Sequence, residues 1–124
     1  MPQLKDNNLH PELMAELVAG RARAADHYID DLVFHISQWA LDRNITAEGG
    51  ATSYTQIPKL IEEVYEFRDA TTEEEAKLEF GDILVVCIQI ARLRGLDMVE
   101  CLDLAYNKIK DRKGRMIDGR FVKE

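Results

Sequence analysis

The spacing of apolar residues between helix-breaking residues limits what this chain can fold into. Proline occurs only at positions 2, 11 and 58, and between the breakers apolar residues recur every three or four positions. That period places them on one face of a helix, whereas a half-buried strand would need strict alternation. The pattern therefore predicts an all-α protein, a bundle of four to five helices.

Residues that start or stop helices divide this pattern. Pro11 suits a first turn, and Thr46 to Thr55 has the composition of a loop. Pro58 is tolerated only in a first turn, so a helix should begin near residue 56. The predicted helices are about 11–25 and 29–44, which can run together, then one from about 56, one over about 73–94, and one from about 97. Gly114 and Gly119 predict an irregular or hairpin-like tail over 114–124.

The composition favours one folded domain and excludes some partners. A chain of 124 residues with 46% hydrophobic and 31% charged residues is an ordinary globular sequence. Its formal charge of −7 argues against nucleic acid as a partner, because such proteins need a cationic surface. An anionic ligand would need a metal ion or the basic stretch from Lys108 to Lys123.

Cysteine usage and the longest apolar run bear on location and assembly. Cys87 and Cys101 lack zinc-site spacing and are expected to be buried thiols. The N-terminal residues show no apolar signal-peptide region, which predicts a cytoplasmic protein. Ile83 to Leu93 is too short to span a membrane. Since residues 80–93 are apolar nearly all round, we expect a subunit interface in a homodimer or homotetramer.

Five acidic residues form the most informative constellation. Glu62, Glu63 and Glu66 share one helical edge, and Glu79 and Asp82 repeat the three-residue spacing on the next helix. A short connection lets the two edges face each other, and a bound cation would offset the repulsion. Carboxylate oxygens suit Mg²⁺, with Mn²⁺ also possible, and disfavour zinc. The plainer interpretation is a solvated face. A di-iron bundle would need Glu-x-x-His pairs, which these acids lack.

Two segments carry a family resemblance. KLIEEVYEF followed by LEFGDILVV resembles the EExxE and ExxD motif pair of the MazG-like, all-alpha nucleoside triphosphate pyrophosphohydrolases. The likeness covers about residues 30–113, and WALDRNIT and NKIKDRKGRM are similar to the small phage and bacterial members. The resemblance implies a single helical domain over 1–124, with the tail 114–124 beyond its core. It also implies hydrolysis of a (deoxy)nucleoside triphosphate to the monophosphate and pyrophosphate.

The resemblance also implies roles for the acids. Glu63, Glu66, Glu79 and Asp82 would be magnesium ligands, while Glu62 would orient or deprotonate the attacking water, or act as an outer-shell ligand. Candidate phosphate-binding residues are basic or amide side chains: Lys59, Asn107, Lys108, Lys110, Arg112, Lys113 and Arg115. The alternative for the late basic residues is that they complement a helix dipole.

Base contacts are expected from His35, Trp39 and Gln56, although a lone tryptophan in a helical stripe is more often a core residue. A second function stays open from the sequence: a non-catalytic helical interaction protein whose acidic edge binds a basic partner. Such a surface needs charge, but it does not need carboxylates that converge from two helices beside an apolar segment.

Overall fold

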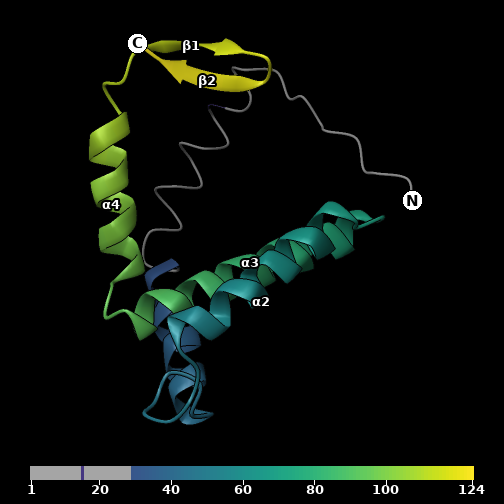
Figure 1. Cartoon of the computed structure of the whole chain (residues 1–124), viewed down its shortest axis with the longest axis vertical. Coiled ribbons are helices and arrows are strands. Elements are labelled where there is room, and N and C mark those ends of the chain that lie inside the picture. The colour runs from purple at the N-terminus through teal and green to yellow at the C-terminus, as the bar shows by residue number, and fades with distance from the viewer. Residues whose placement is uncertain (1–14, 16–28) are drawn as a thin grey trace.

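The computed structural model describes residue 15 and residues 29–124, and this part of the chain is mostly helical. Residues 29–42 form a helix, and the elements that follow are α2 (Ser53–Arg68), α3 (Glu73–Leu93), α4 (Met98–Ile109), β1 (Gly114–Ile117) and β2 (Arg120–Lys123) (Figure 1). The all-α prediction is confirmed, with a small C-terminal hairpin added. The predicted helix over 11–25 lies outside the described residues, apart from Ala15, which is helical.

The start of α2 differs from the prediction. The helix begins at Ser53, not near residue 56, because Thr52 and Thr55 form a reciprocal capping box in which each side chain accepts from the other's backbone N–H. Pro58 consequently lies inside the helix, beyond its first turn. Proline has no N–H, so the cap stabilises a start that leaves one intrahelical hydrogen bond unmade.

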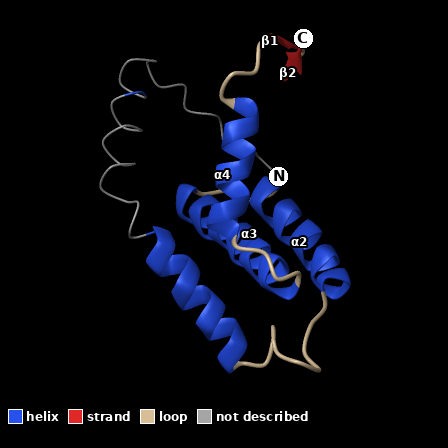
Figure 2. Cartoon of the chain, turned by 90° about the vertical axis from the view of Figure 1, so that its left-hand side faces the viewer, coloured by secondary structure: helices blue, strands red, loops and turns tan. Residues whose placement is uncertain are grey.

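A tight connection turns α2 into α3. Thr72 caps α3 by accepting from the Glu75 N–H, and the Glu75 carboxylate accepts from the N–H and hydroxyl of Thr71. These hydrogen bonds lower the pKa of Glu75. Ala70 is buried in the turn, and Phe67 and Phe80 pack with ring centroids 5.3 Å apart. The two helices therefore run antiparallel and side by side (Figures 1 and 2). The predicted helix starts near 73 and 97 are confirmed.

The hydrophobic core lies where the helix over 29–42 packs on α3 (Figure 2). Arg92 Nε donates to Ser37 Oγ at 3.0 Å and ties these two helices together. The buried apolar residues of the described part are Val33, Ala40, Ala70, Val86, Ile88 and Ala91. Cys87 and Cys101 are only partly buried, so the prediction of two buried thiols was too strong. This partial burial raises the pKa of the Cys87 thiol.

α4 and the hairpin extend away from the α2–α3 pair in both views (Figures 1 and 2). Asp97 caps α4, but none of the α4 residues is buried. β1 and β2 pair antiparallel around Asp118 and Gly119, whose φ angles of 50° and 77° suit a two-residue hairpin turn. None of the helices in the described part of the chain combines the length and apolar content needed to cross a bilayer.

Candidate metal centre and adjoining pocket

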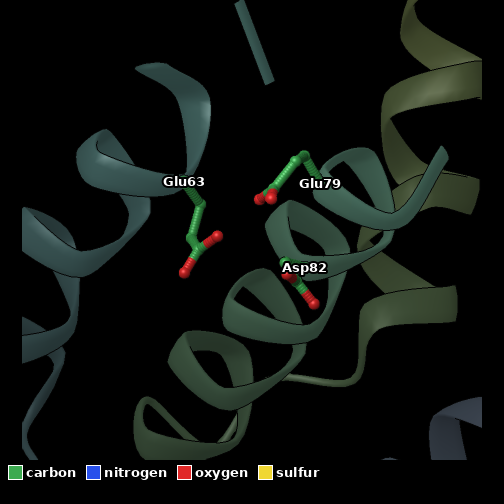
Figure 3. A group of neighbouring side chains, drawn as sticks. All are labelled: Glu63, Glu79 and Asp82. Atoms are coloured by element: carbon green, nitrogen blue, oxygen red, sulfur yellow. The ribbon is translucent and has the colours of Figure 1, made fainter. Parts of the chain in front are cut away.

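Three carboxylates converge between α2 and α3. Glu63 comes from α2, and Glu79 and Asp82 lie one turn apart on α3. One oxygen from each lies within 4.8 Å of the others, and Figure 3 shows the Glu63 and Glu79 side chains pointing toward one another, with Asp82 beside them. The tight turn after Arg68 sets this register, because it brings the second half of α2 against the first half of α3.

Two carboxylate oxygens in this cluster have no partner. Glu63 is only 5% exposed, and its Oε2 and the Oε2 of Glu79 are buried without a hydrogen-bond donor in the described part of the chain. An unpaired buried anionic oxygen is costly, and converging like charges add repulsion. A divalent cation with hard oxygen ligands satisfies both atoms. The three residues therefore fit such an ion.

In the described part of the chain, Lys59 is the basic residue that pairs with an acid of the cluster. Its Nζ lies 3.0 Å from Glu63 Oε1 and 3.8 Å from Glu62 Oε2. The hydrogen bond with Glu63 is the main reason why the pKa of Lys59 is raised. Lys59 pairs with only one oxygen of Glu63, and Oε2 has no hydrogen-bond donor in the described part of the chain.

Glu66 and Glu62 differ in their relation to the three converging acids. Glu66 is exposed, but its pKa is raised to about 7, first by the neighbouring Glu63 carboxylate and then by desolvation and by the Glu79 carboxylate. Glu66 therefore lies beside the cluster without being one of its three converging acids. The Glu62 side chain is 58% exposed, and its ion-pair partner is Lys59. Glu62 therefore lies at the outer edge.

A pocket of about 740 Å³ adjoins the cluster, which is within the range of small-molecule sites. Glu63, Asp82 and Lys59 line it from α2 and α3. Trp39 lines it from the helix over 29–42, and amide side chains are contributed by Gln56 and Gln89. The pocket thus combines acidic residues with an aromatic ring and amides.

The predicted base-contact residues are only partly brought together. Trp39 and Gln56 line the pocket, whereas His35 does not; its ring is exposed and packs edge-on against Phe34. Trp39 is 42% exposed and lies under the guanidinium of Arg43, which is 4.7 Å from the ring centroid.

Arg43, Asn44 and Gln89 are among the pocket residues that had not been predicted as site residues. Arg43 and Asn44 follow the first described helix, and Gln89 lies on α3. Gln89 is only 6% exposed. A signal for it was present in the sequence, since an amide that interrupts an apolar helical run seldom stays buried without a polar role. Arg43 and Asn44 lie in the WALDRNIT segment that is similar to family members, but no site role had been predicted for them.

The late basic residues lie elsewhere in this chain. Asn107 donates its side-chain N–H to the Asp103 backbone carbonyl at 3.0 Å, and Lys108 lies in the last turn of α4. All of the predicted late phosphate contacts are exposed, and none lines the pocket of its own chain: Asn107, Lys108, Lys110, Arg112, Lys113 and Arg115.

The comparisons with known proteins agree with this geometry. Neither the curated proteins nor the solved structures gave a match. The family model of the MazG nucleotide pyrophosphohydrolase domain matches residues 51–117, which is more than half of the 124 residues. The matched region contains α2, α3 and the whole acidic cluster. This chain therefore belongs to the MazG nucleotide pyrophosphohydrolase family and is a hydrolase.

Proposed function

We propose that this protein hydrolyses a (deoxy)nucleoside triphosphate to the monophosphate and pyrophosphate, with magnesium as the cofactor. The observation that carries the proposal is the position of the Glu63, Glu79 and Asp82 cluster beside a pocket lined by Trp39 and two amides. Phosphates at the acidic part and a base beside the ring would fill such a pocket.

Glu63, Glu79 and Asp82, with Glu66 at the border, would hold Mg²⁺ or Mn²⁺. The ion would neutralise phosphate charge and lower the pKa of a bound water. The two unpartnered oxygens, Oε2 of Glu63 and Oε2 of Glu79, support this assignment. More than one ion is compatible with the number of acids nearby.

We assign to Glu62 the activation of the attacking water. Its exposed carboxylate lies outside the three-acid cluster but one residue from Glu63, so it can accept a proton from an attacking water while the other acids stay with the cation. Lys59 would then turn from Glu63 toward a phosphate, because the cation would take over the charge of Glu63.

At the other part of the pocket we assign base recognition to Trp39, Gln56 and Gln89. The indole can stack on a base, and the two amides can each donate and accept hydrogen bonds at its edge. The position of His35 off the pocket gives no support for its predicted base contact.

A substrate screen tests the proposed function. Purified protein is incubated with each ribo- and deoxynucleoside triphosphate and magnesium, and monophosphate and pyrophosphate are measured. We expect pyrophosphate release from at least one triphosphate and its loss when EDTA is added. Release of single phosphate, or no turnover of the whole set, would overturn the assignment.

Trp39 gives a direct test of ligand binding. Because it is the one tryptophan of the chain and lines the pocket, its fluorescence reports on that site alone. We expect a non-hydrolysable triphosphate analogue with magnesium to change the emission in a saturable way. Gln89→Leu should weaken this binding roughly tenfold or more, since a lost polar contact costs about 1.5 kcal/mol. Equal binding by both proteins would remove Gln89 from the site.

We also propose that the protein is a homodimer or homotetramer. α4 carries apolar residues at three- and four-residue spacing that remain largely exposed, and α2 carries a second exposed stripe. The exposed residues are Val99, Leu102, Tyr106 and Ile109 on α4, and Ile57, Ile61 and Val64 on α2. Exposed apolar stripes of this kind are typical of subunit interfaces.

A further inference from the structure

The C-terminal part of the chain differs sharply in charge from the rest. We define the C-terminal arm as residues 108–124, which comprise the end of α4 and the hairpin. From 108 to 124 the sequence has seven basic and three acidic residues, a formal charge of +4, which leaves −11 for the other residues. A cationic arm therefore projects from an acidic body (Figure 1).

The hairpin of this arm exposes both apolar and basic side chains. In the strand register, Met116 lies opposite Phe121, and Ile117 lies opposite Arg120. Since side chains alternate along a strand, Met116 and Phe121 share one face with Lys123, whereas Arg115 and Arg120 share the other with Ile117 and Val122. Met116 is 64% exposed and Phe121 is 51% exposed.

A two-stranded hairpin needs further packing to be stable in water. Met116 and Phe121 bury little surface against the described part of their own chain, because both views place the hairpin beyond the end of α4 and apart from the α2–α3 pair (Figures 1 and 2). The hairpin also extends past the end of the family match at residue 117. Within the described part of the chain, the hairpin is therefore left without a packing partner.

The pocket lacks positive charge that is free to bind phosphates. A triphosphate brings several negative charges to a site that already holds Glu63 and Asp82, and the basic residues that line the pocket are Lys59 and Arg43. Lys59 is engaged by Glu63, and Arg43 lies over Trp39. Cations added from elsewhere would stabilise the phosphates.

We propose that the C-terminal arm of one chain docks on a second copy, with Arg115 and Arg120 facing the acidic pocket of that copy. The arm has the charge that the pocket lacks, and its exposed apolar side chains gain a surface that covers them. This inference rests on the proposed function, because it assigns the arm a role toward the phosphates of the same site. Each pocket is then completed by its neighbour.

Mixing two defective chains tests the proposal. The first chain carries Glu79→Gln and Trp39→Phe, so its pocket is disabled and silent in fluorescence while its arm is intact. The second carries Arg115→Gln and Arg120→Gln, which remove the charge but keep polar, unbranched side chains on the hairpin. We expect each alone to lose turnover, at least tenfold for the second, and the mixture to recover. With random exchange in a dimer, about a quarter of all sites would combine an intact pocket with an intact arm.

A fluorescence measurement separates this inference from the proposed function. In the mixture, Trp39 belongs only to the arm-deficient chain. We therefore expect its emission to change when the arm-intact chain is added, even without a nucleotide, and analogue binding to tighten. That change would support docking even if no triphosphate were hydrolysed. Full activity of the arm-deficient chain alone, a monomer by sedimentation at assay concentration, or no recovery after exchange verified with tagged chains would overturn the proposal.

Discussion

Glu79→Gln is expected to lower magnesium-dependent turnover by roughly 100-fold or more, while it raises the melting temperature of the metal-free protein. The loss of activity follows because an amide is a poorer ligand than a carboxylate, and a cation contributes several kcal/mol to the stabilisation of phosphate charge. Turnover at saturating magnesium measures this loss.

The gain in stability has a separate cause. In the metal-free protein, Glu63, Glu79 and Asp82 hold ligand atoms within 4.8 Å of one another, and Oε2 of Glu79 is buried without a partner. A glutamine removes one negative charge and supplies two N–H donors to the carboxylates beside it. Thermal unfolding in EDTA should therefore show a higher melting temperature for Glu79→Gln than for the wild type.

Magnesium should reverse the order of the two melting temperatures. At a concentration about 100 times its Kd, a ligand that binds only the folded state adds about 2.7 kcal/mol, or roughly 5–10 °C for a chain of this size. We expect that shift in the wild type and its loss in Glu79→Gln. Glu74→Gln is the matched control, because Glu74 is an exposed acid in the first turn of the same helix. An unchanged magnesium shift in Glu79→Gln would remove Glu79 from the metal centre.

The sequence predicted the acidic centre because its determinants are local. Acids three and four residues apart must share a helical edge, and the short connection between Arg68 and Glu73 forces the two helices to lie antiparallel. Those two facts are enough to bring Glu63 near Glu79. They do not separate the buried Glu63 from the exposed Glu62, since adjacent residues on a helix edge differ in burial only through the packing of the next helix.

The pocket and the arm depend on longer-range packing. Trp39 and Gln89 lie on different helices, and only the packing of the first described helix on α3 places both beside Gln56. The start of α2 was predicted wrongly because it was placed from Pro58 alone. The three-residue spacing of Thr52 and Thr55 could have shown the cap that starts the helix at Ser53. The separation of α4 from the α2–α3 pair has no local signal, because an amphipathic helix shows a sequence pattern without showing which surface covers it.

Glu62→Gln is expected to lower kcat by about 10²- to 10⁴-fold, the range associated with loss of a general base. The magnesium-dependent rise in melting temperature should persist, because Glu62 lies outside the three-acid cluster and its side chain is 58% exposed. This combination, lost turnover with retained metal binding, would set Glu62 apart from Glu79.

A magnesium titration distinguishes the two roles that remain open for Glu62. If Glu62 accepts the proton of the attacking water, the loss of kcat persists at saturating magnesium. If it acts as an outer-shell ligand, metal affinity falls roughly 10- to 100-fold and excess magnesium restores turnover. Glu74→Gln again serves as the control for removal of one exposed charge. Wild-type kcat at every magnesium concentration would exclude both roles. The ion pair with Lys59 would then be the one interaction assigned to Glu62 in the described part of the chain.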